Sequence, residues 1–324
     1  MRNMEEYKNT IILPTLYCIG EALVDFIPYG ETPDGTQLLA PMPGGATANT
    51  AVAAAKLGAR SSFIGKVGDD GFGHMLIDVI QGYGVDTAYM SMTRYACTTL
   101  AFVTLSSEGD RSFTFARKPG ADMLLSEGDI PDIFIRKGDM LHFGTLGLMP
   151  GSPSKAAHIK ALRSAKAAGA LISFDPNVRR PLWDDPEELR ATILEFLPFA
   201  DIVKMCDDEL QFIFHTHDEA EASARCFENG ASLVFVTRGK DGAAVYTREF
   251  SAEVPGLAVT AVDTTGAGDA FNGAMLSRLI GKPLKVCTGK AELTDTLRFA
   301  NAAGAVTVTR KGAMAGSPSA NEVI

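Results

Sequence analysis

The stretch that decides the fold lies between residues 140 and 175. It contains two short apolar segments, MLHFGT (140–145) and ALISFD (170–175), and between them the helical pattern PSKAAHIKALRSAKAA (153–168). Short apolar runs that alternate with helices are typical of strands buried on both faces of a parallel sheet. The stretch therefore predicts a strand, a helix and a second strand, which is the repeating unit of α/β proteins.

The same alternation extends along most of the chain. We expect further strands at 16–25, 61–67, 201–205 and 232–237, and a small hairpin at 242–247. We expect further helices at 46–57, 71–83, 186–197, 207–214, 218–228, 267–280 and 290–304. The sequence therefore predicts an α/β fold in which a mainly parallel central sheet carries helices on both faces.

Two β-rich insertions interrupt this pattern. Residues 98–106 and 111–117 predict a hairpin with its turn at 107–110, and residues 30–43 predict a loop or short edge strands. We expect these insertions to form a small second layer. The expected division is an α/β domain (16–29, 44–96 and 120–324), a β layer (30–43 and 97–119) and a leader (1–15).

The composition narrows the class of protein. The chain has 324 residues, with 30 Lys and Arg against 39 Asp and Glu, a formal net charge of −9. Nucleic-acid binders are usually basic, so we expect no nucleic-acid partner. No apolar run approaches the roughly 18 residues of a membrane span, and the leader does not have the pattern of a signal peptide. Five scattered cysteines predict reduced thiols in a cytoplasmic protein.

The segment VDTTGAGDAF (262–271) carries the strongest chemical signal. Gly266, Ala267 and Gly268 begin a predicted helix, whose unpaired N–H groups and positive dipole end suit a phosphoryl group. Asp269 lies in the first turn, where a carboxylate can accept a proton from an attacking hydroxyl. The alternative is an ordinary loop whose acid stabilises the helix. Because the P-loop and G-x-G-x-x-G motifs are absent, a nucleotide enzyme would need a loop of this kind.

Two segments suit a polyol. In PGGATAN (43–49), Gly44 and Gly45 allow a backbone to approach a ligand closely, and Asn49 can both donate and accept hydrogen bonds. The alternative is a tight turn with a capping Asn. Asp25 ends the first predicted strand and could accept two vicinal hydroxyls, although a lone Asp there is more often a turn residue.

Two segments suit a nucleotide. Arg179 follows the strand at 170–175 and could form bidentate bonds to phosphate, while the alternative is a solvated surface arginine. The segment TRGKDG (237–242) also follows a strand, and its alternative is the entry to a hairpin.

The spacing of two of these segments resembles a known family. GGAxxN (44–49) and DTTGAGD (263–269) resemble the two signatures of the ribokinase-like, phosphofructokinase B type carbohydrate kinases, and the resemblance runs from about Cys18 to Ala313. Four other segments look like the fructokinase branch: GEALVD (20–25), DPNVRRPLW (175–183), DDEL (207–210) and VTRGKDGA (236–243).

The resemblance implies ATP-dependent phosphorylation of a primary hydroxyl of a monosaccharide, with D-fructose as the expected sugar. In the family, the residue that matches Asp269 is the base, and the three residues before it form the anion hole. The residues that match the sugar contacts are Asp25, Gly44, Gly45 and Asn49. The residues expected to contact ATP are Arg179, Lys204, Thr237, Gly239 and Asn301.

The resemblance also implies ions and a lid. Glu209 is expected to hold Mg²⁺ through water, although Cys206 stands where the family often has Asn. A monovalent cation, expected to be K⁺, would lie near Asp263, Thr265 and Gly312. The β insertions match the family's lid, which covers the sugar and often forms a homodimer contact. Its residues Phe113, Phe115 and Arg117 are expected to close over the sugar, with Arg117 bonding an outer hydroxyl.

Other functions stay open on the same fold. The chain could phosphorylate ribose, a nucleoside or 2-keto-3-deoxygluconate, or it could be a catalytically silent sugar-binding scaffold. The intact Asp269 and the small residues before it count against a silent protein, since a scaffold has no need of a base.

Overall fold

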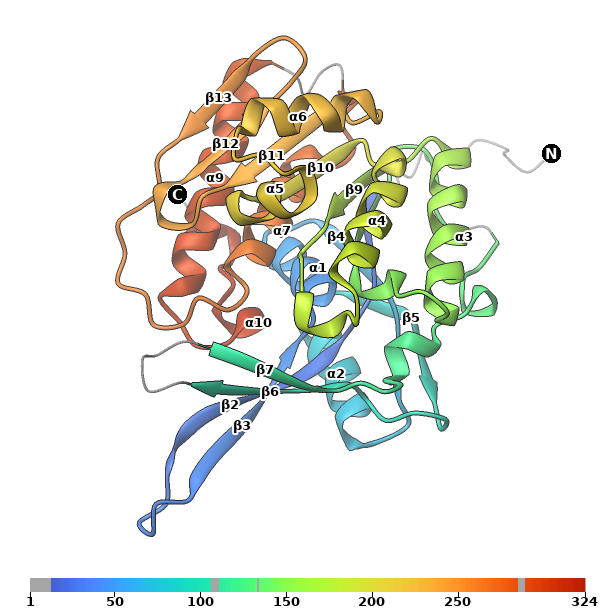
Figure 1. Ribbon diagram of the computed structural model, residues 1–324, viewed down its shortest axis with the longest axis vertical. Helices are drawn as coiled ribbons and strands as arrows, with labels where there is room; N and C mark the ends of the chain where they lie inside the picture. Colours follow the sequence, from blue (N-terminus) through green and yellow to red (C-terminus); the bar gives the residue numbers. More distant parts are fainter. Residues whose placement is uncertain (1–12, 106–110, 133, 285–288, 324) are drawn as a thin grey trace, which may run out of the picture.

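The computed structural model describes residues 13–105, 111–132, 134–284 and 289–323, and a nine-stranded sheet forms its centre (Figure 1). The strand order is β13-β12-β11-β10-β9-β8-β1-β4-β5. The strands from β5 to β11 in this order pair in parallel, whereas β12 and β13 add an antiparallel edge. The bounds are β1 Thr15–Ile19, β4 Arg60–Gly68, β5 Asp86–Thr93, β8 Met140–Gly144, β9 Leu171–Asp175, β10 Ile202–Cys206, β11 Leu233–Thr237, β12 Ala243–Tyr246 and β13 Ser251–Val254.

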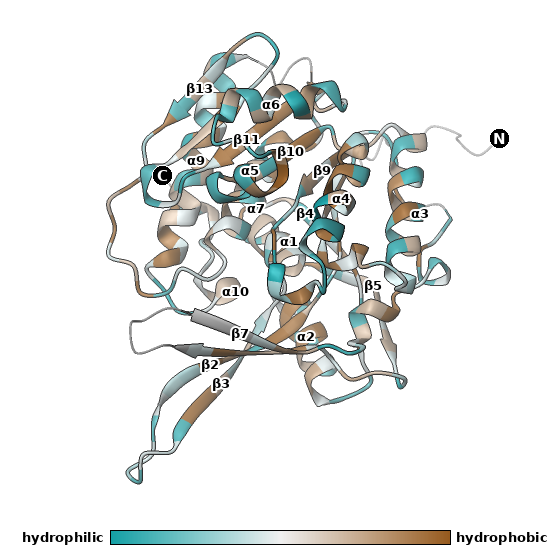
Figure 2. Ribbon diagram, viewed as in Figure 1, coloured by the Kyte–Doolittle hydropathy of each residue, from teal (hydrophilic) through white to brown (hydrophobic). Residues whose placement is uncertain are grey.

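Helices cover both faces of this sheet, as the sequence predicts. Along β11, Leu233 and Phe235 join a core with α1, α2, α7 and α9, whereas Val234 and Val236 join a second core with α3 to α6. Burial on both faces explains why the strands at the centre of the sheet are mainly apolar. Figure 2 shows this concentration of hydrophobic residues in β10 and β11. The helices are α1 Ala46–Lys56, α2 Gly71–Gly82, α3 Pro153–Ala168, α4 Pro186–Phe196, α5 Asp207–Phe214, α6 Glu219–Glu228, α7 Ala267–Leu279, α9 Lys290–Val308 and α10 Ala313–Gly316.

A second, four-stranded sheet has the order β3-β2-β6-β7 and projects from one side of the molecule (Figure 1). Its strands are β2 Leu23–Glu31, β3 Gln37–Gly44, β6 Leu100–Leu105 and β7 Arg111–Ala116. The antiparallel pairing of β6 with β7 confirms the predicted hairpin, whose expected turn at 107–110 lies outside the described residues. Of the two alternatives predicted for 30–43, the strands are correct, because β2 and β3 form an antiparallel pair that includes Glu31 and Gln37.

Two expected boundaries were wrong. The predicted strand at 16–25 is two strands in different sheets, because the chain leaves β1 at Ile19 and enters β2 at Leu23. The small sheet thus begins before residue 30, and Asp25 lies inside one of its strands, not at the end of a central strand. The apolar pattern continues across the break, so hydropathy alone does not reveal it. The half-exposed β5 was not predicted, and the hairpin expected at 242–247 extends to Val254.

Within the described residues, no helix combines the length and the hydropathy that a membrane-spanning segment requires.

Gly45 joins the small sheet to the central domain, between β3 and α1. Its φ of +106° lies where side chains are strained, and an added Cβ would stand 2.3 Å from the carbonyl oxygen of Glu21. The neighbouring Gly58 also has a positive φ, +91°, but an added Cβ would meet no atom within 4 Å. Substitution of each of the two glycines by alanine therefore distinguishes the cost of backbone strain from the cost of a steric collision.

We predict that Gly45→Ala lowers the free energy of unfolding more than Gly58→Ala does. The strain of a positive φ alone costs about 1–2 kcal/mol, and the collision with Glu21 adds to it only at Gly45. Chemical denaturation of both variants measures the difference. Equal losses would show that the connection between β3 and α1 moves freely to admit a methyl group.

Candidate active site

The N-terminus of α7 forms the centre of the candidate site. Gly266 precedes the helix with a φ of +80°, and an added Cβ would stand 2.3 Å from the Cβ of Ala313, so only glycine fits there. Ala267 and Gly268 begin the first turn, where N–H groups and the helix dipole favour an anion. The Nζ atom of Lys204 stands 3.3 Å from the position of a Cβ on Gly268. A helix N-terminus and an ammonium group thus lie side by side.

Asp269 projects from the first turn of the same helix and is partly buried. Its Oδ2 atom accepts a 2.8 Å hydrogen bond from Nδ2 of Asn49, which is buried one turn into α1. Burial raises the pKa of Asp269 to about 6, while the Asn49 hydrogen bond and the charges of Arg179 and Lys204 act in the opposite direction. The side chain is therefore mostly a carboxylate at neutral pH, and its pKa lies near the range that suits a general base.

Lys204 lies in a buried cluster of charged and polar side chains. Its Nζ atom lies 3.2 Å from Oδ2 of Asp175, at the carboxyl end of β9, and Nδ2 of Asn272 donates to the same oxygen at 2.6 Å. Burial lowers the pKa of Lys204, but the charges of Asp175 and Glu209 outweigh it and raise the pKa overall. Lys204 therefore stays a cation at neutral pH and can face an anionic ligand.

The residues expected to hold the sugar gather around Asp269. Asp25 reaches across from β2, and its Oδ2 atom would stand 2.2 Å from a Cβ on Gly44, so the glycine makes room for the carboxylate. Burial raises the pKa of Asp25 to about 7, and the charge of Asp269 adds to the rise. Asn49 completes the group through its bond to Asp269.

The residues expected along ATP are spread more widely. Arg179 is exposed after β9, and its charge lowers the pKa values of both Asp25 and Asp269. Thr237 ends β11, and Gly239 follows it with a φ of +54°. Asn301 of α9 donates to the carbonyl oxygens of Val254 and Pro255 at 3.3 and 3.4 Å. In the described part of the chain, no hydrogen bond joins these last three residues to Asp269.

The two carboxylates expected near ions each accept two backbone N–H groups. Glu209 accepts from Val178 at 2.6 Å and from Cys206 at 2.8 Å. Asp263 accepts from Thr265 and from Gly312, both at 3.0 Å, and so ties the loop before α7 to the loop before α10. The described residues contain no cluster of three or more His, Cys, Asp or Glu side chains that could hold a metal ion.

Arg117 differs from the expectation that it bonds an outer hydroxyl of the sugar. Its guanidinium is buried and lies 2.6 Å from Oδ2 of Asp122, and it also donates to the carbonyl oxygen of Leu146 at 2.8 Å. Its Nη1 atom contacts the sulfur of Met149. These contacts direct the arginine into the protein. The side chain of Phe113 lies outside what the structure describes.

Sequence reasoning missed two carboxylates of this region. The motif that contains Asp175 predicts no role for it, although an acid at the carboxyl end of a parallel strand is a usual place for a ligand-binding group. The segment GEALVD predicts no role for Glu21 either, and Glu21 is only 2% exposed. A charged residue inside an apolar run was the available signal for Glu21.

Comparisons with known proteins show which family and which relatives the chain resembles. The model of the pfkB family carbohydrate kinases matches residues 14–320. "Probable fructokinase-3" of Arabidopsis thaliana is 43% identical over 312 residues, which cover 94% of this chain and 89% of the relative. A fructokinase of Vibrio cholerae, solved with fructose, ADP and calcium ion bound, has 38% identity and a TM-score of 0.86, covering 95% and 96% of the two chains.

A relative with a different ligand is also similar. An aminoimidazole riboside kinase of Salmonella enterica, solved with aminoimidazole riboside and an ATP analog, has 32% identity and a TM-score of 0.83, covering 95% of this chain and 98% of its own. With a family model that matches residues 14–320 and a relative that is 43% identical over 94% of the chain, the chain belongs to the pfkB family of carbohydrate kinases.

Proposed function

We propose that this protein is a fructokinase, which transfers the γ-phosphoryl group of ATP to the terminal hydroxymethyl group of D-fructose. The observation that carries the proposal is the meeting of Asp269, Asn49 and Lys204 at the N-terminus of α7. A proton acceptor, a polar sugar contact and a cation for phosphate thus share one site.

In the proposed reaction, the sugar hydroxyl lies between Asp269 and the γ-phosphorus of ATP. Oxygen attacks phosphorus, the hydroxyl proton passes to the Asp269 carboxylate, and the bond to the β-phosphate oxygen breaks, leaving ADP. Negative charge on the transferring group is stabilised by the N–H groups at the start of α7, by Lys204 and by Arg179. Asp269 then releases its proton to solvent before the next turnover.

The choice of sugar rests on the relatives and on the polar side chains. The names of the Arabidopsis and Vibrio relatives support fructose. Asp25, Gly44, Gly45 and Asn49 offer acceptors and donors for adjacent hydroxyls, which any small polyol could use. The similarity to the Salmonella riboside kinase supports a ribosyl compound as a second candidate.

We also propose Mg²⁺ and K⁺ as the ions of this site. When bound to ATP, Mg²⁺ neutralises phosphate charge, and it usually keeps several waters. The oxygens of Glu209 already accept two N–H groups, so a water-mediated contact fits them better than direct ligation. Asp263 is buried beside the loop that leads into α7, so a K⁺ ion there would order that loop.

The proposal extends to the assembly and the compartment. We propose a homodimer that covers the small sheet, because Leu38 and Leu39 of β3 are 43% and 40% exposed and Tyr29 of β2 is 64% exposed. Light scattering measures the mass of the particle in solution and so tests for the homodimer. The four cysteines of the described residues form no disulfide with one another, which supports a cytoplasmic protein.

We predict that Asp269→Asn lowers kcat at least about 100-fold and leaves fructose binding in place, because Asn can accept the Asn49 hydrogen bond but cannot accept a proton. Asp208→Asn removes an exposed acid from the first turn of α5 and is the control. Near-normal turnover of Asp269→Asn would exclude Asp269 as the base.

We also predict that kcat/KM of the unsubstituted protein falls as the pH is lowered from 7 to 6, because Asp25 and Asp269 take up protons in this range.

Arg179 and Arg180 form a matched pair for testing the phosphate contact. Both are exposed, but the charge of Arg179 reaches Asp269, whereas Arg180 lies over the ring of Phe212 at 4.6 Å. We expect Arg179→Ala to raise KM for ATP by about tenfold, the value of one charge-assisted hydrogen bond, and Arg180→Ala to leave it unchanged. The same KM in both variants would place Arg179 on the solvated surface.

The substrate is tested by kcat/KM for fructose, ribose, a nucleoside and 2-keto-3-deoxygluconate, each with saturating ATP and Mg²⁺. We expect fructose to lead by at least about 1000-fold over a compound that leaves buried polar groups unpaired. A rival that exceeds fructose by tenfold would overturn the substrate, and turnover of none of them would overturn the kinase proposal.

A further inference from the structure

The chain crosses between the two sheets at four places, and buried polar groups gather at these crossings. It passes outward between β1 and β2 at 20–22 and between β5 and β6 at 94–99. It returns between β3 and α1 at Gly45, and after β7 at 117–120. Any change in how the small sheet sits over the site has to pass through these segments.

Glu21 lies in the crossing at 20–22, and its side chain binds the chain where it returns at Gly45. Its Oε1 atom accepts the N–H of Ala46 at 2.8 Å, and the hydroxyl of Thr47 donates to its carbonyl oxygen at 3.3 Å. Gly45 is the residue before α1 and has no side chain, so it cannot cap the helix in the usual way. The carboxylate of Glu21 takes that part from a distant segment, at the end of the helix where a negative charge is favoured.

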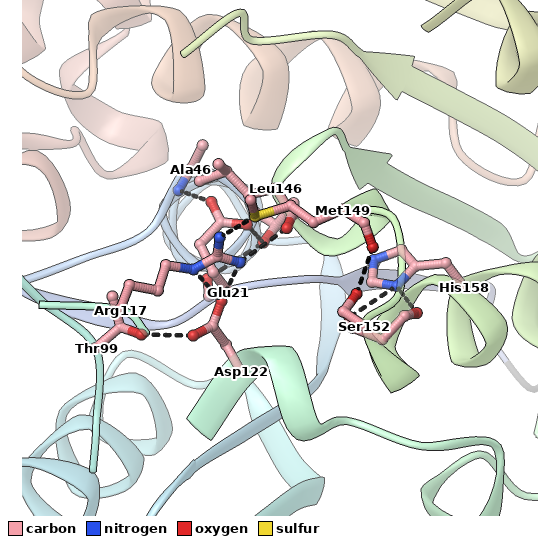
Figure 3. Close-up of polar contacts among 11 residues, drawn as sticks. Glu21, Ala46, Thr99, Arg117, Asp122, Leu146, Met149, Ser152 and His158 are labelled. Atoms are coloured by element: carbon pink, nitrogen blue, oxygen red, sulfur yellow. Dashed lines mark hydrogen bonds and ion pairs between the residues drawn. The ribbon is translucent and has the colours of Figure 1, made fainter. Parts of the chain in front are cut away.

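An ion pair beside Glu21 holds the other two crossings. Asp122, which follows the last crossing, accepts from Nε and Nη2 of Arg117 at 2.9 and 2.6 Å, and from the hydroxyl of Thr99 at 2.5 Å. Figure 3 shows the Arg117 guanidinium between Asp122 on one side and Leu146 and Met149 on the other. The charges of Arg117 and Asp122 both reach Glu21. Burial raises the pKa of Glu21 to about 7, the charge of Asp122 adds to the rise, and that of Arg117 opposes it.

The same carboxylate borders the chemistry. Glu21 and Asp269 line one small cavity, together with Thr47, Thr50 and Asn177. Thr50 has a buried hydroxyl without a protein partner, which makes the cavity polar. Glu21 therefore caps the start of α1, which follows Gly44 and Gly45 and carries Asn49. The same part of the helix faces Asp269 across the cavity.

We propose that Glu21 is a positioning residue for sugar binding: by capping α1 across the crossing, it holds Asn49 and the Gly44–Gly45 loop in register with Asp269. The Arg117–Asp122 pair holds the remaining crossings against the same point. This role rests on the proposed function, because the measurement that tests it is the affinity for fructose. Loss of the cap lets the start of α1 move, and a misplacement of about 1 Å in a site can lower the rate of the reaction by up to about 100-fold.

The test compares Glu21→Ala, Glu21→Asp and Glu21→Gln in the full chain. Ala removes the acceptor, Asp shortens it by one methylene, and Gln keeps an oxygen for the N–H of Ala46. We expect Ala and Asp to raise KM for fructose at least about tenfold with KM for ATP within twofold, and Gln to restore most of the fructose affinity. Isothermal titration with fructose alone gives the same comparison without turnover.

Asp139→Ala is the matched control. Asp139 is also 2% exposed and accepts a backbone N–H at 2.8 Å, from Thr15, but it precedes β8 at the opposite end of the sheet. We expect it to lower the melting temperature and leave KM for fructose unchanged. A substitution that only lowers stability reduces the amount of folded enzyme and leaves its KM unchanged.

Distinct results overturn the two proposals. An unchanged fructose KM in Glu21→Ala and Glu21→Asp, an equal rise in KM for ATP, or no rescue by Gln would overturn the positioning role. If Glu21→Ala does not fold, Glu21→Asp and Glu21→Gln decide the matter alone. Failure of the unsubstituted protein to bind or phosphorylate fructose would overturn the proposed function instead.

Discussion

The close approach of helices α1 and α7 is the constraint on which the site depends. At Gly273 an added Cβ would stand 2.6 Å from the Cβ of Ala53 and 2.9 Å from the carbonyl oxygen of Thr50, so the two helices meet backbone to backbone. This contact brings the first turn of α1 beside the first turn of α7, where Asn49 donates to Asp269. Small residues along α1 are therefore a requirement of the chemistry as well as of the packing.

The site is electrostatically costly at neutral pH. Burial raises the pKa values of Glu21 and Asp25 to about 7 and that of Asp269 to about 6, against ordinary values of 4.5, 3.8 and 3.8. The folded state thus binds protons more tightly than the unfolded chain, and these groups favour folding less as the pH rises through their folded pKa values. The two apolar cores offset this cost, and the carboxylates stay available for substrate.

The sequence predicted the central domain well because its signals are local. Alternating apolar strands and helices depend on neighbouring residues, and the expected helix at 153–168 agrees with α3. The segments around Gly44 and Asp269 were likewise recognisable, because they resemble the two signatures of the family. The break at Gly20 was missed, because the run from Leu16 to Asp25 reads as one apolar strand whichever sheet its halves join.

Long-range partners explain what the sequence did not predict in the site. Arg117 follows an aromatic strand, a place that suits a ligand contact, yet Asp122 and the carbonyl of Leu146 bind it once the chain folds back. Glu21 caps a helix that begins 25 positions later. Neither partner leaves a periodic pattern in the sequence. Both residues lie where the chain passes between the sheets, so the connections between the two layers depend on hydrogen-bond partners that only the folded chain brings together.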